Sequence, residues 1–123
     1  MSSADKFLEV FNQLKSILKI YEPEKKLITD TPDHYYLNTH KINPKNKLPI
    51  FFAAAQIKKN YVSYHLMPVY VFPELLEDIS ETLKKRMQGK SCFNFKEVNE
   101  ELIEELKQLT EKGCQKYREN HLV

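Results

Sequence analysis

The sequence predicts an α+β domain: an antiparallel sheet, a three-strand meander plus one further strand, with helices packed mainly on one face. Apolar residues recur at helical spacing over residues 7–21 and 102–117. Between them, residues 48–57 and 61–72 are rich in apolar and aromatic residues, and a short polar connection separates the two runs. The expected order of elements is helix, three strands, helix, strand, helix.

The first helix is expected to begin at Ser2 or Ser3, which are suitable N-cap residues, and to end before Pro23. Residues 24–33 are largely polar and predict an exposed loop. Residues 35–42 predict an edge strand. The expected inward stripe of the helix is Phe7, Val10, Phe11, Leu14, Ile17, Leu18 and Tyr21.

Side-chain alternation sets the register of the central hairpin. With Lys59 and Asn60 as a two-residue loop, one face contains apolar pairs, and we predict this face to be the core: Ile57 with Val62, Ala55 with Tyr64, and Ala53 with Leu66, followed by Tyr70 and Phe72. The opposite face then pairs Gln56 with Ser63, Ala54 with His65, and Phe52 with Met67. Pro68 predicts a bulge or an edge position, because proline lacks the donor for a ladder hydrogen bond.

A second helix is expected from Pro73 to a C-cap at Gly89, with Ser80 as a point where it could divide into two. Phe93 and Phe95 of the next strand are predicted to point inward. Asn99 is a suitable cap for the last helix, in which Gly113 indicates close packing. Residues 1–3 and 119–123 are expected to fray.

Length and composition indicate a single domain spanning residues 1–123. Nineteen basic and seventeen acidic residues leave a net charge of +2, which gives no reason to expect a nucleic-acid partner. No apolar stretch is long enough to span a membrane, and the start MSSADK lacks the layout of a signal peptide, so we expect a cytoplasmic protein. Cys92 and Cys114 are expected to be free thiols, with Cys114 structural.

The face opposite the predicted core is the candidate site. If the strand containing Phe93 joins the sheet, its polar residues lie beside Ser63 and His65, and Ala54 leaves room there. We expect a binding module for a small anionic ligand rather than an enzyme. The predicted ligand-binding residues are Gln56, Tyr61, Ser63, His65, Met67, Lys90, Cys92 and Asn94.

Several other residue groups have simpler interpretations than a functional site. Gly89, Lys90 and Ser91 do not make a phosphate loop, because Lys84 occupies the position of the required first glycine. His65 and Cys92 would suit a base and a nucleophile, although a packing thiol is the simpler interpretation. The histidines are scattered, so no metal or other cofactor is expected. Basic residues at the end of the second helix and at the hairpin would bind an anion or simply be solvated: Lys84, Lys85, Arg86 and Lys90, with Lys58 and Lys59.

The strings KNYVSYHLMPVY and KKRMQGKSCFNF resemble the YdhG-like family of small cytoplasmic proteins, over roughly residues 52–117. The resemblance implies an α+β fold and no established activity. A branch of that family is described as frataxin-like, which implies iron delivery as an alternative function. A further alternative is a structural or interaction protein that forms a homodimer through the sheet face or edge. The matching positions are Lys59, Tyr61, Val62, His65, Met67, Pro68, Tyr70, Gly89, Lys90, Ser91, Cys92 and Phe93.

Overall fold

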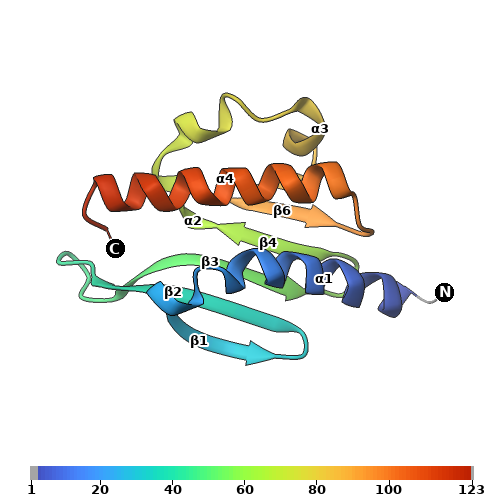
Figure 1. The fold of residues 1–123 in the computed structure, drawn as a ribbon, viewed down its shortest axis with the longest axis horizontal. Coiled ribbons are helices and arrows are strands. Elements are labelled where there is room, and N and C mark those ends of the chain that lie inside the picture. Colours follow the sequence, from blue (N-terminus) through green and yellow to red (C-terminus); the bar gives the residue numbers. More distant parts are fainter. Residues whose placement is uncertain (1–2, 123) are drawn as a thin grey trace.

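The computed structural model describes residues 3–122 and confirms the α+β class (Figure 1). A six-stranded antiparallel sheet has the order β1-β2-β3-β4-β6-β5. The strands are β1 (Lys26–Thr31), β2 (His34–Ile42), β3 (Pro49–Ile57), β4 (Val62–Leu66), β5 (Met87–Gln88) and β6 (Cys92–Phe95). Within residues 3–122, no helix combines the length and the apolar character needed to cross a membrane.

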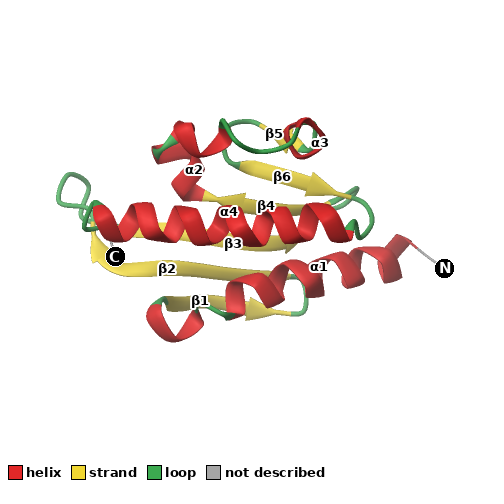
Figure 2. Cartoon of the chain, turned by 45° about the horizontal axis from the view of Figure 1, so that its top comes forward, coloured by secondary structure: helices red, strands yellow, loops and turns green. Residues whose placement is uncertain are grey.

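Two long helices, α1 (Ser3–Lys19) and α4 (Glu100–Glu119), lie side by side over one face of the sheet (Figures 1 and 2). The shorter elements are η1 (Glu22–Glu24), α2 (Met67–Val71), η2 (Pro73–Leu76) and α3 (Glu81–Lys84). The apolar stripes of both long helices face the sheet and bury Val10, Leu14 and Leu106 completely. Both long helices lie on the same side of the sheet in Figure 2, so within residues 3–122 the opposite face, called the open face below, carries no long helix.

The predicted register of the central hairpin is confirmed. Ile57 pairs with Val62, Ala55 with Tyr64, and Ala53 with Leu66. The last two pairs, like Val62, are fully buried and form the centre of the core. The alternation was informative here because one face of these two strands is buried and the other is partly solvated.

The prediction of an exposed loop over residues 24–33 was wrong. This segment contains η1 and the edge strand β1, which pairs with β2. The strand predicted at residues 35–42 is therefore an inner strand. Five of the six β1 residues are exposed, so an edge strand lying outside the core shows no apolar alternation from which it could be recognised.

A β-bulge in β3 corrects the predicted position of Phe52 on the open face. Leu37 pairs with Ala53 and Asn38 pairs with Phe51, so Phe52 has no partner in β2. The extra residue turns both Phe52 and Ala53 toward the core. Phe51 therefore lies on the open face, where its ring stacks on Tyr36 with 4.6 Å between centroids.

The bulge is held from the helical side of the sheet. The hydroxyl of Tyr117 in α4 donates a hydrogen bond of 2.9 Å to the main-chain oxygen of Phe51. The ring of Phe52 is fully buried and packs between Tyr21 and Tyr117, with centroid separations of 5.5 and 6.1 Å. The irregular backbone is thus both hydrogen-bonded and packed.

The third predicted strand also ends earlier than expected. β4 stops at Leu66, and Met67 begins α2, so the predicted pairing of Met67 with Phe52 was wrong. Pro68 lies in the first turn of α2, where a missing amide hydrogen costs no intrahelical bond. Tyr70, predicted on the core side, is instead 53% exposed. Tyr70 lies within α2, so the alternation of a strand does not set the direction of its side chain.

Residues 73–88 form two short helices, η2 and α3, followed by the strand β5, instead of remaining helical up to Gly89. Ser80 divides the segment, as anticipated, because its Oγ accepts a hydrogen bond from the Leu83 amide and caps α3. Glu105 of α4 accepts hydrogen bonds from both the amide and the hydroxyl of Ser80. Gly89, predicted as a helix C-cap, lies in the turn between β5 and β6 with a φ of +79°.

The expected features of α4 are confirmed within the described residues. The Asn99 side chain accepts a hydrogen bond of 3.1 Å from the Leu102 amide and caps the helix. A β-carbon at Gly113 would lie only 2.7 Å from the β-carbon of Pro68, so α4 and α2 pack closely there. Near the end of the chain, the Leu122 main-chain amide donates a hydrogen bond to the Tyr117 carbonyl, and the fraying expected for residues 119–123 stays a prediction. Ser3 is already helical, whereas Met1, Ser2 and Val123 lie outside the described residues.

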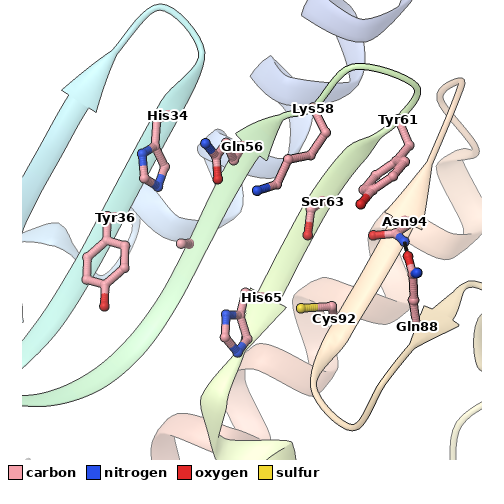
Figure 3. Close-up of a pocket in the computed structure, with 11 residues that line it drawn as sticks. His34, Tyr36, Gln56, Lys58, Tyr61, Ser63, His65, Gln88, Cys92 and Asn94 are labelled. Atoms are coloured by element: carbon pink, nitrogen blue, oxygen red, sulfur yellow. Dashed lines mark hydrogen bonds between the residues drawn. The ribbon is translucent and has the colours of Figure 1, made fainter.

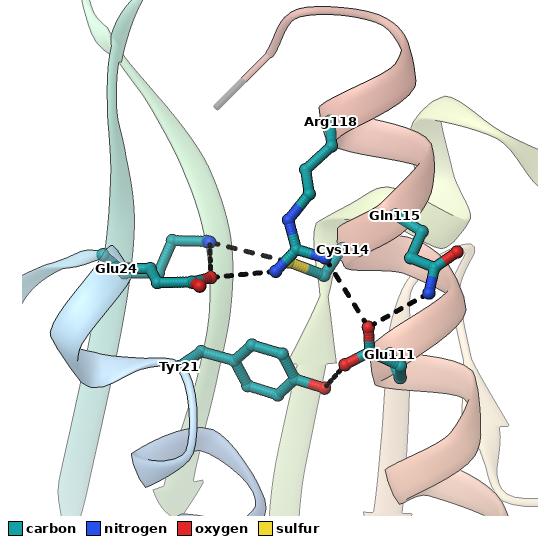
Figure 4. A network of polar contacts seen from close by, with 7 residues as sticks. Tyr21, Glu24, Glu111, Cys114, Gln115 and Arg118 are labelled. Atoms are coloured by element: carbon teal, nitrogen blue, oxygen red, sulfur yellow. Dashed lines mark hydrogen bonds and ion pairs between the residues drawn. The ribbon is translucent and has the colours of Figure 1, made fainter.

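A polar network fastens the segment after α1 to α4 (Figure 4). The Arg118 guanidinium donates a 2.9 Å hydrogen bond to Glu24, and the Tyr21 hydroxyl donates one of the same length to Glu111. Lys25 is almost fully buried, with its ammonium 3.6 Å from the sulfur of Cys114. Both cysteines are free, and burial raises the pKa of the Cys114 thiol, as expected of a structural residue.

Candidate functional site

The open face of the sheet contains a cavity of about 390 Å³ (Figure 3). It extends from β2 across β3 and β4 to the β5–β6 hairpin, so residues distant in sequence contribute to one surface. The pairing of the strands brings these residues together, because side chains two residues apart on each strand point to the same face of the sheet. The lining residues are His34, Tyr36, Ala54, Gln56, Lys58, Tyr61, Ser63, His65, Gln88, Cys92 and Asn94.

Two cross-strand rows form the floor and walls of the cavity. In the first row, His34, Gln56, Ser63 and Asn94 are successive partners across β2, β3, β4 and β6. All four can form hydrogen bonds.

The second row consists of Tyr36, Ala54, His65 and Cys92 across the same four strands. Ala54 is the small residue of this row, and its partners on the two neighbouring strands are the ring-bearing residues Tyr36 and His65. The cavity exists there because a methyl group occupies the position where a larger side chain would fill the space. The sequence predicted this role for Ala54.

The structure brings together most of the predicted ligand-binding residues. Six of the eight line the cavity: Gln56, Tyr61, Ser63, His65, Cys92 and Asn94. They meet because β6 joins β4 in the register anticipated from the alternation of Phe93 and Phe95, which are both buried.

Met67 and Lys90 do not join this group, and their placement in the site was wrong. Met67 belongs to α2 because β4 has already ended. Lys90 precedes β6 and lies in the turn, with its ammonium 6.0 Å from the centroid of the Tyr70 ring. Lys90 lines a separate, more apolar cavity together with Val69 and Leu76.

Sequence reasoning missed His34, Tyr36, Lys58 and Gln88 as lining residues. A signal was available for the first two, since they alternate with the buried Tyr35 and Leu37 of β2. Lys58 had been considered only as a basic residue of the hairpin. No signal was available for Gln88, because the two-residue strand β5 is hidden at the end of an apparently helical stripe.

The cavity lining carries cationic and neutral groups only. Lys58 supplies an ammonium, and none of the eleven lining residues, all within the described part of the chain, is an aspartate or a glutamate. Burial lowers the pKa of His65, so its imidazole is neutral at pH 7. The ring of Phe51 contacts His65 edge-on, with 4.8 Å between centroids.

His65 makes the stability of the protein depend on pH. Its pKa is lower in the folded than in the unfolded state, so its contribution is present above about pH 6.5 and is lost as the pH falls through the folded value. We expect the free energy of unfolding, measured by urea denaturation, to be lower at about pH 5.5 than at about pH 7.5. His65→Gln should reduce this difference, while the exposed His121→Gln should retain it. An unchanged pH dependence in His65→Gln would contradict the assignment.

Asn94 contains an unsatisfied polar atom at the cavity. Its Nδ2 donates a hydrogen bond of 2.6 Å to Oε1 of Gln88, but its Oδ1 is buried and has no hydrogen-bond partner among the described residues. A buried acceptor without a donor costs free energy, and such atoms in native proteins require an explanation. A donor group of a bound molecule would satisfy this oxygen.

Cys92 and His65 are direct partners across β4 and β6, which brings the two candidate catalytic side chains into one row. Within residues 3–122, no hydrogen bond connects them. We predict that Cys92 is a packing thiol: in a Cys114→Ser background, it should react with iodoacetamide no faster than a free thiol at neutral pH. Rapid alkylation at about pH 6 that disappears in His65→Ala would instead indicate an activated nucleophile.

Among residues 3–122, no three side chains of histidine, cysteine, aspartate or glutamate are grouped as the ligands of a metal ion would be.

Comparisons of the chain with protein-family models, curated proteins and solved structures found no match. The resemblance to the YdhG-like family stays a prediction.

Proposed function

We propose that this protein is a binding module for a small anionic ligand, which occupies the cavity on the open face of the sheet. The observation that carries the proposal is the lining of this cavity: an ammonium from Lys58, several neutral hydrogen-bonding groups, and no carboxylate. A carboxylate or phosphate would be attracted to Lys58 and would meet no opposing charge within the lining.

The dimensions and donors of the cavity support a small molecule. Its volume of about 390 Å³ lies at the lower end of the range of ligand-binding cavities, which is about 300 to 1,000 Å³. The side chains of Gln56, Tyr61 and Ser63 can each donate a hydrogen bond to an anion. Rings of Tyr36 and His65 add apolar surface, so the lining would accept a ligand with both charged and uncharged parts.

Binding is favoured over catalysis by the state of the two reactive side chains. Catalysis by Cys92 would require a base within hydrogen-bond reach of its thiol, and none is engaged among the described residues. The neutral His65 imidazole can accept or donate a hydrogen bond to a ligand without transferring a proton. We expect the ligand to be a cytoplasmic metabolite, in keeping with the location predicted from the sequence.

A thermal-shift screen of phosphorylated and carboxylated metabolites tests the proposal. A ligand present at about 100 times its Kd should add about 2.7 kcal/mol to the free energy of unfolding and raise Tm. Lys58→Met should weaken this effect, whereas Lys112→Met, an exposed lysine of α4, should leave it unchanged. The absence of any stabilising anion, together with a homodimer in solution that covers the open face, would support the interaction-protein alternative instead.

A further inference from the structure

A second cavity of about 370 Å³ continues the first toward the edge of the sheet. The two cavities share Tyr61, Gln88 and Asn94 in their linings. The second is also lined by Lys85, Arg86, Met87 and Lys96, so three cationic side chains gather at this end. Its lining likewise contains no aspartate or glutamate.

The β5–β6 hairpin explains why Arg86 and Lys96 face the same side as the first cavity. The main-chain amide of Asn94 donates a hydrogen bond of 2.8 Å to the Arg86 carbonyl. This bond continues the ladder beyond the pair of Met87 with Phe93. Phe93 points into the core, so Arg86 and Gln88 on one strand and Asn94 on the other point outward. Lys96 follows β6 two residues after Asn94, so its side chain points to the same face as that of Asn94.

These three cations have no anionic partner in the described part of the chain. The ion pairs formed there use Lys15, Lys25, Lys84, Lys116 and Arg118, and not Lys85, Arg86 or Lys96. Clustered cations that form no ion pair repel one another, and a dianion would relieve that repulsion. An arginine fork also matches the oxygen geometry of a phosphate.

The unpaired side-chain oxygen of Asn94, Oδ1, belongs to a residue that lines both cavities. Its Oδ1 needs a hydrogen-bond donor, and an ionised phosphate offers mainly acceptors. The donor would therefore come from an uncharged part of the same ligand, next to the phosphate. Hydroxyl groups suit the adjoining first cavity, where Ser63 and Gln56 can also exchange hydrogen bonds with them.

We infer that the ligand is a phosphate monoester of a hydroxylated compound, such as a sugar phosphate. This inference rests on the proposed function and adds an orientation to it. The phosphate lies against Lys85, Arg86 and Lys96, and a hydroxyl donates to Asn94 Oδ1. The body of the ligand extends over the open face toward His65.

Calorimetric titration with matched phosphates tests the two ends of the site separately. The probes are ribose 5-phosphate, glucose 6-phosphate and glycerol 3-phosphate, compared with propyl phosphate, which has no hydroxyl on its body. At least one hydroxylated ester should bind about tenfold or more tightly than propyl phosphate, which corresponds to one lost hydrogen-bonded contact. Arg86→Gln, and independently Lys96→Gln, should weaken all phosphates by about tenfold.

Variants at the junction identify the donor contact. Asn94→Ala should remove the preference for the hydroxylated esters over propyl phosphate. Asn12→Ala is the matched control, because Asn12 is an exposed asparagine of α1 that lines neither cavity, so the preference should persist.

The outcomes separate this inference from the proposed function. If carboxylates bind in a manner sensitive to Lys58→Met but not to Arg86→Gln or Lys96→Gln, the phosphate end is overturned while the proposed function survives. If all phosphates bind equally and Asn94→Ala changes nothing, the hydroxyl contact is overturned. If no phosphate or carboxylate binds at all, both the inference and the proposed function fail.

Discussion

Phe93→Ala is expected to lower the free energy of unfolding by about 3 to 5 kcal/mol. The Phe93 ring is fully buried on the core side of β6, the strand that joins the short β5 to the rest of the sheet. Its neighbours across the ladder are Tyr64 on β4 and Met87 on β5. Truncation would leave a cavity between these strands and α4, which urea denaturation would measure as a lower midpoint.

The adjacent residue provides the control for this prediction. Asn94 lies on the opposite face of the same strand, so Asn94→Ala removes no core packing, and we expect it to cost no more than about 1.5 kcal/mol. A similar loss in the two variants would mean that Phe93 is not buried as described. It would also remove the basis for placing Asn94 and Cys92 on the open face.

Phe52→Ala should be equally destabilising, at about 3 to 5 kcal/mol, and Phe51→Ala much less so. The reason is the bulge in β3, which buries Phe52 between Tyr21 and Tyr117 and leaves Phe51 on the open face. Phe51 would lose a ring stack with Tyr36, a contact of about 0.5 to 1.5 kcal/mol. Comparison of the two unfolding free energies measures the bulge directly.

Regular alternation through β3 would predict the opposite ranking. In that case Phe51→Ala would be the costly change, and Phe52→Ala would leave the free energy of unfolding almost unaltered. That result would contradict the bulge and the hydrogen bond between the Tyr117 hydroxyl and the Phe51 carbonyl.

The parts of the fold that were predictable are those with strong local patterns. Val62, Tyr64 and Leu66 alternate with the polar residues Ser63 and His65, so the register followed from the side-chain pattern alone. The Asn99 cap and the apolar stripe of α4 were equally local signals. The bulge was not predictable, because it depends on Tyr117, a residue distant in sequence that binds the irregular carbonyl.

The short or exposed strands lacked a readable pattern. β1 lies at an edge outside the core, so its side chains do not alternate in burial, and β5 has only two residues. Missing β5 had a consequence for the site, since Arg86 was assigned to the end of a helix, where the structure places Lys85 as the C-cap of α3. Once β5 pairs with β6, Arg86 and Asn94 become neighbours, and the basic residues adjoin the candidate cavity.

The central claim is that the open face of the sheet binds a small anion, and amide chemical-shift mapping tests it most directly. Isotope-labelled protein would be titrated with the anion that stabilises it most in the thermal screen. The account predicts saturable shifts at the amides of His34, Gln56, Ser63 and Asn94, and no comparable shifts along α1 and the outer side of α4. Shifts confined to those helices, or saturation that leaves the four open-face amides unmoved, would contradict it.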